Sequence, residues 1–299
     1  MKKFLFLSLF FLLVVSVNAQ TYNLVWSDEF NENNIDANWN KEVTDKPANN
    51  ELQAYVSSPR NIDVVDGNLV LTARRETKGT RYFLSGRVNT KNKVNFEHGV
   101  IRARIKLPKT KGGLWPAFWM MGEDISMIGW PHCGEIDILE CGHSQGMGGN
   151  EETFFSAALH WGKDPKNHSY LSYTKNNAYS VEDDYHIWTC VWTEETISCY
   201  LDDQTEPYFT TPVGTGHAPS AFVHKPNFIL LNIAVGGDFP DIHNPNDVTA
   251  LPKIGSEAKM LVDWVRVYQP EGGVNVFAVN NDMNSVPAAE KVFTLKANK

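Results

Sequence analysis

Short runs of alternating apolar and polar residues follow one another along most of this 299-residue chain. The runs are rich in Val, Ile, Phe, Tyr and Trp, polar turns separate them, and no long stretch shows a helical period. The strongest hairpin signal is Asp66-Gly67 between the apolar runs 61–65 and 68–73, because this pair suits a two-residue turn. Similar alternation is found in segments 99–107 and 187–192. Many short strands with polar turns predict an all-β fold, either a β-sandwich or a jelly roll.

The run 134–140, Gly-Glu-Ile-Asp-Ile-Leu-Glu, breaks the alternation once. In a strand, Glu135 and Asp137 share one face, but Glu140 lies three positions after Asp137 and would point to the opposite face. One extra residue at positions 138 and 139 would return Glu140 to the carboxylate face and keep the isoleucines on the apolar face. Such β-bulges are often found beside active sites. The pattern therefore predicts a bulged strand that gathers three carboxylates on one face.

Two plainer interpretations of this run are weaker. In a helix, Asp137 and Glu140 would pair one turn apart, but Glu135 would lie off that face, and Pro131 and Gly134 are poor helix starts. In a solvated edge strand the acids would simply face water, although three acids on one face repel one another unless something uses them. We therefore favour a strand whose carboxylates have a chemical role.

The spacing of the two glutamates is compatible with cleavage of a glycosidic bond. With one step lost at the bulge, Glu135 and Glu140 are four ladder positions apart, so their Cα atoms are roughly 13 Å apart. Side chains that lean toward each other can bring the carboxyl groups to the roughly 5–5.5 Å of a retaining glycosidase. A separation of about 6.5 Å or more would suit an inverting enzyme, and the spacing alone leaves both open.

At this motif the chain resembles glycoside hydrolase family 16, whose laminarinase-like branch carries Glu-x-Asp-x-x-Glu on a bulged strand. The lichenase and xyloglucan-active branches have the shorter Glu-x-Asp-x-Glu on a regular strand, and this chain has the longer form. The resemblance implies that Glu135 is the nucleophile, Glu140 the general acid/base and Asp137 the residue that tunes the nucleophile. Further segments match in family order between residues 22 and 268, namely 26–30, 50–53, 61, 66–69, 85–87, 99–108, 113–119, 159–162, 231–237 and 262–268.

The same resemblance implies a fold and an activity. The expected fold is a concanavalin A-like jelly roll, a curved two-sheet sandwich with an open concave cleft. The expected activity is that of an endo-acting retaining β-glucanase on β-1,3-glucan such as laminarin or on mixed-linkage β-1,3-1,4-glucan, with no cofactor for catalysis. One alternative is a non-catalytic β-glucan-binding module, but such relatives have lost the paired glutamates. The other is a hydrolase of agar or porphyran, against which the acidic composition counts.

Two tryptophans are predicted to bind the sugar. Trp115 and Trp119 flank Pro116 in a segment that the resemblance places in the cleft, and Trp130 lies nearer the acids in the sequence. The flat C–H face of a pyranose packs on an aromatic ring while its hydroxyl groups keep polar partners. A core position is the alternative, with more weight for Trp119, which is followed by two methionines.

Four polar residues are further candidates for substrate contact. Arg87 has five donors in a fixed geometry that can hold vicinal hydroxyl groups or a neighbouring carboxylate, and its alternative is a surface salt bridge. His160 either lies beside the acids or is a satisfied histidine of the core. Glu51 and Asn61 are candidates through the resemblance alone.

The resemblance also implies a structural calcium ion far from the cleft. Its matching ligands are Glu29, the backbone oxygen of Gly67 and Asp263, with water completing a shell of oxygen ligands. Such an ion would tie the N-terminal segment and the last core strand to the Asp66-Gly67 hairpin. The alternative is that Glu29 and Asp263 are ordinary surface acids.

Residues 1–19 are predicted to be a secretory signal peptide, because Lys2 and Lys3 precede an apolar run and Ala19 precedes Gln20. Loss of the two lysines changes the formal net charge from −8 to −10. A chain this acidic is a poor ligand for nucleic acid and anionic lipid, so we expect neither as a partner. We expect an exported monomer, whether periplasmic, cell-surface or secreted, with a catalytic jelly-roll domain over 20–269.

Three further features leave alternatives open. Cys190 and Cys199 flank a predicted hairpin turn, so they can face each other across two strands. They would then form either a disulfide or a pair of buried free thiols. An extended chain between Cys133 and Cys141 makes a disulfide between them doubtful. The extension 270–299 has no assigned role and is either an added strand pair or a mobile tail. The glycine-rich segment 146–150 is predicted to be a flexible loop at one end of the cleft.

Overall fold

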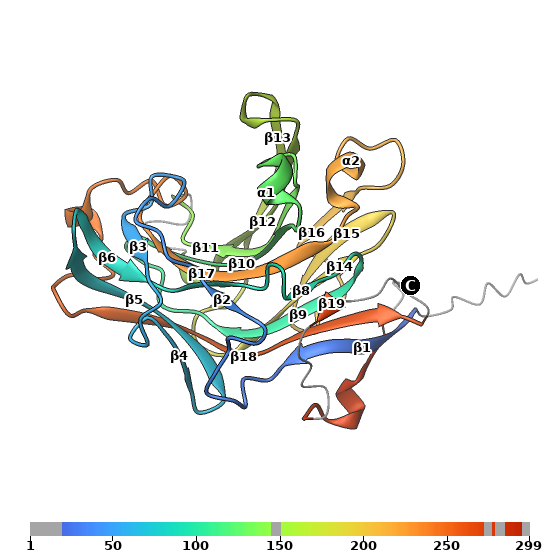
Figure 1. Cartoon of the computed structure of the whole chain (residues 1–299), viewed down its shortest axis with the longest axis horizontal. Helices are drawn as coiled ribbons and strands as arrows, with labels where there is room; N and C mark the ends of the chain where they lie inside the picture. The colour runs from blue at the N-terminus through green and yellow to red at the C-terminus, as the bar shows by residue number, and fades with distance from the viewer. Residues whose placement is uncertain (1–19, 145–150, 272–276, 279–284, 295–299) are drawn as a thin grey trace, which may run out of the picture.

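The computed structural model describes residues 20–144, 151–271, 277–278 and 285–294. Two large sheets dominate it, and Figure 1 shows the smaller one lying over the larger one. Apart from the parallel pair β3 and β6, neighbouring strands are antiparallel. This two-sheet architecture confirms the predicted all-β sandwich.

The larger sheet has eleven strands in the order β16-β15-β14-β9-β18-β5-β6-β3, with β1, β4 and β20 attached off this path. Its members are β1 (Thr21–Asp28), β3 (Gln53–Tyr55), β4 (Ile62–Val65), β5 (Asn68–Lys78), β6 (Arg81–Ser85), β9 (Gly99–Lys106), β14 (His186–Trp192), β15 (Thr196–Leu201), β16 (Phe209–Pro212), β18 (Glu257–Pro270) and β20 (Val292–Thr294).

The smaller sheet has seven strands in the order β13-β12-β11-β10-β17-β7-β2. They are β2 (Asn40–Lys41), β7 (Arg87–Asn89), β10 (Leu114–Gly122), β11 (Glu135–Cys141), β12 (Phe154–Gly162), β13 (His168–Asn176) and β17 (Asn227–Val235). A separate pair joins β8 (Val94–Asn95) to β19 (Phe277–Ala278). The described helices are α1 (Ile125–Ile128), α2 (Ser220–Val223) and four 3₁₀ turns, η2 (Glu151–Thr153), η3 (Pro165–Asn167), η4 (Pro245–Asp247) and η5 (Ala288–Glu290).

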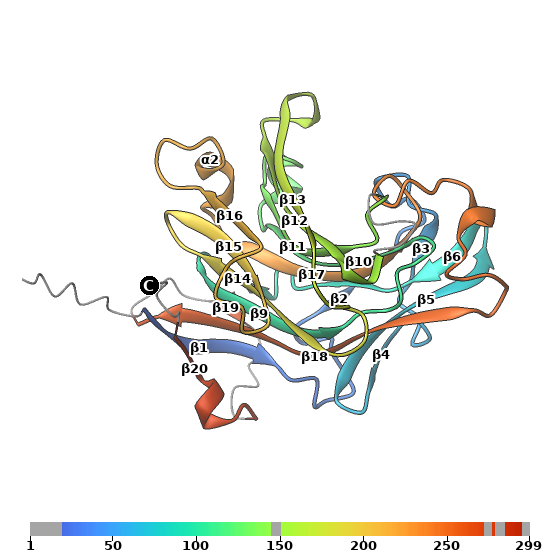
Figure 2. The same ribbon diagram turned by 180° about the vertical axis from the view of Figure 1, so that it is seen from behind.

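The main core fills the space between the two sheets. Alternate apolar residues of each sheet point into it, for example Phe118 of β10 and Ile229 of β17 from one side and Ile101 of β9 and Met260 of β18 from the other. These side chains are fully buried, and burial of apolar area of this kind is the main favourable term in folding. Figure 2 shows the β12–β13 end of the smaller sheet and helix α2 rising on the side away from the larger sheet.

The predicted Asp66-Gly67 hairpin is present. Val65 of β4 pairs with Asn68 of β5, and the two residues between them have φ angles of 50° and 72°. Positive φ at both turn positions is the geometry of a type I′ hairpin, which the Asp-Gly sequence favours. Strands β9 and β14 also lie where alternation predicted them, within one residue at each end.

The C-terminal extension adds strands, but not as a pair of its own. Within its described residues, β20 pairs with β1 and β19 pairs with β8. Phe293 of β20 lies against Tyr22 and Tyr268, at 6.3 Å and 6.1 Å between ring centroids. The extension therefore widens the larger sheet, on the opposite side of the core from the smaller one. The predicted signal peptide and loop 146–150 lie outside the described residues, among which no helix is long and apolar enough to cross a membrane.

All four cysteines are buried free thiols. Cys190 and Cys199 are direct partners across β14 and β15, as their positions around the hairpin predicted. Of the two alternatives for this pair, the structure therefore shows the reduced one. Burial raises the pKa of the Cys199 thiol well above its ordinary value, so it has little thiolate character.

Candidate active site

The bulge in β11 places the three acids on one face. Asp137 pairs with Ala158 of β12 and Glu140 pairs with Ser156, so two residues of β11 oppose one residue of β12. The same irregularity is present on the β10 side. The extra residue returns Glu140 to the face of Glu135 and Asp137, and the strand's three central apolar side chains are all buried, namely Ile136, Ile138 and Leu139. The predicted bulge at positions 138 and 139 is confirmed.

Each glutamate receives a hydrogen bond from a tryptophan. Trp130 Nε1 donates to Glu135 Oε2 at 2.9 Å, and Trp115 Nε1 donates to Glu140 Oε1 at 3.0 Å. An N–H donor fixes the position of a carboxyl group and stabilises its ionised form. The indoles therefore hold the two acids in place, one at each end of the triplet.

His160 lies beside the acids rather than in the core. Its Nε2 is 3.3 Å from Asp137 Oδ2 and 4.0 Å from Glu135 Oε1. Its Nδ1 is 2.9 Å from His168 Nε2, and its ring stacks on those of His168 and Tyr170. The stack fixes the ring plane, so a positive charge on His160 would face two of the three carboxylates.

The electrostatics of the triplet favour protonated acids. Burial is the largest cause, and it raises the pKa of Glu135, Asp137 and Glu140 to about 8 each. The charge of Asp137 raises the pKa of both glutamates further, whereas His160 and the tryptophan N–H groups lower it. Because the three groups interact, they titrate as a unit, and at neutral pH the site holds fewer than three negative charges.

Strand register shows which other residues share the acid-bearing face. Residues directly opposite one another across an antiparallel ladder lie on the same face. One such row runs from Glu140 through Ala117 of β10 and Asn232 of β17 to Arg87 of β7. The next row runs from Asp137 through Trp119 to Leu230 and Asn89. The outer face of the smaller sheet thus presents acids, aromatic rings and amides side by side.

The two predicted tryptophans both lie on this face, and both are partly exposed. Trp115 stacks on Phe239 with 4.8 Å between ring centroids and an interplanar angle of 12°. Trp119 donates from Nε1 to Asn232 Oδ1 at 2.8 Å, with Arg87 over its ring at 5.5 Å. Neither is an inner core residue, and their contact with sugar stays a prediction.

Arg87 and Glu51 belong to one buried cluster. The Arg87 guanidinium lies 4.2 Å from the Tyr55 ring centroid, 3.4 Å from Glu42 and 3.8 Å from Glu51. Glu51 accepts hydrogen bonds from Gln53 and Tyr55, and burial raises its pKa. Arg87 was predicted to bind either vicinal hydroxyl groups or a neighbouring carboxylate, and the structure shows it beside the carboxylates of Glu42 and Glu51. Glu51 is 2% exposed, so its own contact with substrate has no support in the structure.

Asn61 lies in the turn before β4 of the larger sheet and not among the acids. Its Nδ2 donates to the backbone oxygen of Thr72 at 2.9 Å, and the residue is 2% exposed. Its carbonyl oxygen lies close enough to Gly86 to leave no space for a Cβ atom there. The structure thus shows Asn61 joining the turn before β4 to strand β5, and nothing in it supports substrate contact.

The predicted calcium ligands line one hollow on the larger sheet, but arginines occupy them. Glu29 accepts hydrogen bonds from Arg266 at 2.9 Å and 2.7 Å, and Asp263 accepts one from Arg104 at 2.6 Å. Gly67 lines the same hollow. A divalent cation would have to displace two guanidinium groups and would meet their positive charge. The residues as arranged do not fit a calcium ion.

Several neighbours of the acids were not predicted from the sequence. Trp130 was noted only for its position near the motif, and Phe239, His168 and Tyr170 were not singled out. Their roles depend on contacts between strands, and the only available signal was their aromatic or imidazole character near family-like segments. His168 and Tyr170 lie two residues apart on β13, which is the spacing for one strand face.

An all-β sandwich with paired glutamates on a bulged strand is an arrangement suited to glycoside hydrolysis. The family model described as Beta-porphyranase A-D, GH16 domain, matches residues 22–270. The chain therefore belongs to glycoside hydrolase family 16, and its relatives make it a laminarinase-like member.

Two curated relatives are glucan endo-1,3-beta-glucosidases. Glucan endo-1,3-beta-glucosidase A1 of Niallia circulans is 34% identical over 83% of this chain, which spans only 38% of that relative's length. The glucan endo-1,3-beta-glucosidase of Cryptopygus antarcticus is 36% identical over 81% of this chain and 91% of its own. A solved structure of a Bacteroides ovatus mixed linkage glucan GH16 protein with a G4G4G3G product is 38% identical, covers 81% of this chain and 99% of its own, and has a TM-score of 0.73.

Proposed function

We propose that this protein is an exported, endo-acting retaining β-glucanase that hydrolyses β-1,3-glucan or mixed-linkage β-1,3-1,4-glucan. The observation that carries the proposal is the gathering of Glu135, Asp137 and Glu140 on one face by the bulge, with a tryptophan N–H on each glutamate. The kinship with endo-1,3-glucosidases and with a mixed linkage glucan protein supports the substrate class.

The reaction would proceed by double displacement. Glu135, as carboxylate, attacks the anomeric carbon while Glu140 gives its proton to the departing glycosidic oxygen. Glu140 then takes a proton from water, whose oxygen attacks the same carbon and breaks the bond to Glu135, so the anomeric configuration is retained. No cofactor takes part in these steps.

The surroundings of the two glutamates suit these different roles. Glu135 accepts a hydrogen bond from Trp130 Nε1 and lies 4.0 Å from His160 Nε2, and both contacts favour its carboxylate, although the same imidazole also lowers the pKa of Glu140. Glu140 is buried, and the charge of Asp137 raises its pKa, which keeps the proton that an acid catalyst needs. Asp137 Oδ2 is buried, makes no hydrogen bond among the described residues and lies 3.3 Å from His160 Nε2, so it faces the imidazole beside the nucleophile.

A second candidate substrate is porphyran, because the matching family model is described as a beta-porphyranase domain. Porphyran is an anionic polysaccharide, whereas this chain has a formal net charge of −8. Like charges repel, so a neutral glucan is the better match. A non-catalytic glucan-binding module is a poorer match, because both glutamates are present.

One assay separates these functions. The release of reducing ends is measured from laminarin, barley β-glucan, agarose, porphyran and xyloglucan, with Glu135→Gln as the inactive control. We expect activity on laminarin, barley β-glucan or both, with oligosaccharide products of several lengths. Activity on porphyran alone, or binding of glucan with no hydrolysis, would overturn the proposal.

A further inference from the structure

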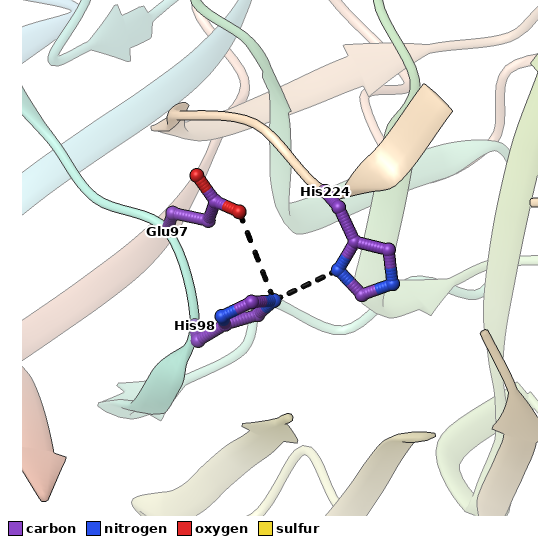
Figure 3. Close-up of side chains that lie close together, drawn as sticks. All are labelled: Glu97, His98 and His224. Atoms are coloured by element: carbon purple, nitrogen blue, oxygen red, sulfur yellow. Dashed lines mark hydrogen bonds and ion pairs between the residues drawn. The ribbon is translucent and has the colours of Figure 1, made fainter. Parts of the chain in front are cut away.

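Glu97, His98 and His224 form a cluster of potential metal ligands outside the acid triplet. Glu97 and His98 lie between β8 and β9, and His224 follows α2 directly. Figure 3 shows the three side chains converging from these two segments. One ligand atom from each lies within 4.8 Å of the other two. The cluster therefore brings together two parts of the chain that are far apart in sequence.

Hydrogen bonds fix which nitrogen of His224 is free to bind a metal. His224 Nε2 is 2.8 Å from the backbone oxygen of Val213, and a carbonyl oxygen only accepts, so Nε2 carries the proton. The lone pair of a neutral His224 is therefore on Nδ1, which lies 2.8 Å from His98 Nε2. A ligating histidine whose other nitrogen donates to a backbone carbonyl is the usual arrangement at protein metal sites.

The distances in the cluster are close to those of a tetrahedral zinc site. Zn–N and Zn–O bonds are about 2.0–2.2 Å long, so two tetrahedral ligand atoms are roughly 3.3–3.5 Å apart. His98 Nε2 is 2.8 Å from His224 Nδ1 and 3.9 Å from Glu97 Oε1, one distance below this range and one above it. An opening of the first distance and a closing of the second, each by roughly half an ångström, would bring both into this range. The ligand atoms of Glu97 and His224 already lie within 4.8 Å of each other.

The surroundings hold the backbone of this cluster in place. Gln269 Nε2 donates to the backbone oxygens of both Glu97 and His98 at 3.0 Å. The His98 ring packs edge-on against Trp192, with 5.1 Å between ring centroids. A neutral imidazole is the form that binds metal, and His98 needs only to shift its proton from Nε2 to Nδ1.

We propose that Glu97 Oε1, His98 Nε2 and His224 Nδ1 bind a divalent transition-metal ion, Zn²⁺ by preference, with water as the fourth ligand. Imidazole and carboxylate ligands suit zinc, whereas calcium prefers a shell of oxygen atoms. The ion would link the segment before β9 to the segment after α2. The backbone oxygen of Phe222 in α2 lies against Gly134, directly before Glu135, so the link would also steady the approach to β11.

The test is metal binding by the untagged chain, with Co²⁺ as a spectroscopic probe and Zn²⁺ as competitor. We expect one equivalent of Co²⁺ to give the visible absorption of a four-coordinate ion, Zn²⁺ to abolish it, and Zn²⁺ to raise the melting temperature by binding the native state. His98→Ala and His224→Ala should each weaken Zn²⁺ binding by at least about 100-fold. His217→Ala is the matched control, because His217 is exposed and lies just before α2, whereas His224 directly follows it.

Two further variants keep the test decisive. Glu97→Gln preserves the volume of a partly exposed side chain, so it should fold normally and still weaken Zn²⁺ binding about tenfold or more. Glu135→Gln controls for the second cluster of this kind, Glu135, Asp137 and His160. If binding is lost in Glu135→Gln but kept in His98→Ala and His224→Ala, the ion belongs to the acids and the proposal is wrong. No Co²⁺ absorption and no thermal shift would also overturn it, leaving only a histidine–histidine hydrogen bond.

Discussion

At the scale of single residues, Glu135 and Glu140 are chemically identical side chains that have different neighbours. Both accept from an indole N–H, but only Glu135 also lies 4.0 Å from the His160 imidazole. Burial raises the pKa of both, so the charge needed for nucleophilic attack depends on these few polar contacts. A change at either residue should therefore affect chemistry far more than folding.

Glu135→Gln tests the nucleophile directly. We expect hydrolysis to fall by at least about 1000-fold, because the uncharged amide cannot form the glycosyl-enzyme ester. Trp130 can still donate to the amide oxygen, so the melting temperature and oligosaccharide binding should change little. The measurements are reducing-end release, thermal unfolding and binding by calorimetry, with exposed Glu206→Gln as control. Activity within tenfold of wild type would show that another residue is the nucleophile.

Glu140→Gln tests the buried acids through the pH dependence of stability. The folded-state pKa of Glu140 is about 8, above its ordinary value of 4.5, so between these pH values the native state binds a proton that the unfolded state has lost. The contribution of Glu140 to the free energy of unfolding is therefore fully present below pH 4.5, and it is lost progressively as the pH rises toward 8.

In Glu140→Gln this loss disappears, and the pKa of Glu135 falls because a neighbouring negative charge is gone. We expect the variant to melt at least about 2 °C above wild type at pH 8. The two proteins should have similar melting temperatures at pH 4.5 and below. If the difference in melting temperature between the two proteins is the same at every pH, burial does not destabilise the ionised form of Glu140.

At the scale of elements, β11 and β20 each modify one of the two sheets, in different ways. The bulge in β11 changes which side chains share a face without changing the strand's neighbours, β10 and β12. Strand β20 instead adds a new edge to the larger sheet through β1. The first affects chemistry, and the second should affect stability alone.

Phe293→Ala tests the contribution of β20. Phe293 packs on Tyr22 and Tyr268, and removal of a partly buried aromatic side chain should lower the melting temperature by about 2–8 °C. Catalytic constants should remain within twofold of wild type, because the acids lie on the other sheet. Exposed Val292→Ala is the control in the same strand and should leave the melting temperature unchanged. A large loss of activity with unchanged stability would link the extension to the active site.

At the scale of the whole molecule, ion pairs join segments near the two ends of the described chain. Arg266 of β18 binds Glu29 after β1 and also Glu290 of the C-terminal extension. Three distant segments thus meet at one guanidinium, where the family resemblance had suggested a cation.

Calcium should therefore have no effect on stability. We expect an excess of CaCl₂ to move the melting temperature by less than about 1 °C, because an ion that does not bind the native state gives no stabilisation by mass action. Zn²⁺ is measured alongside, because the proposed Glu97, His98 and His224 site predicts a rise with Zn²⁺ and none with calcium. A rise with calcium that is lost in Asp263→Ala would show that the ion displaces the arginines and that the calcium site exists.

The sequence by itself determined the features that depend on local periodicity. The two-residue repeat of a strand predicted the all-β class, the Asp66-Gly67 turn and the bulge that aligns Glu140 with Glu135. These features need only the covalent geometry of neighbouring residues and the difference between apolar and polar side chains. Resemblance added roles for Trp115 and His160, whose places near the acids the structure bears out.

Only the tertiary structure decided which distant residues meet. Glu29 and Arg266 are 237 positions apart, and nothing in either neighbourhood of the sequence shows that they pair. His98 likewise met His224, 126 positions later, through the order of strands and the path of the loops between them. The physical reason is that alternation fixes which face a side chain occupies, whereas its partner on that face depends on which strands lie beside it.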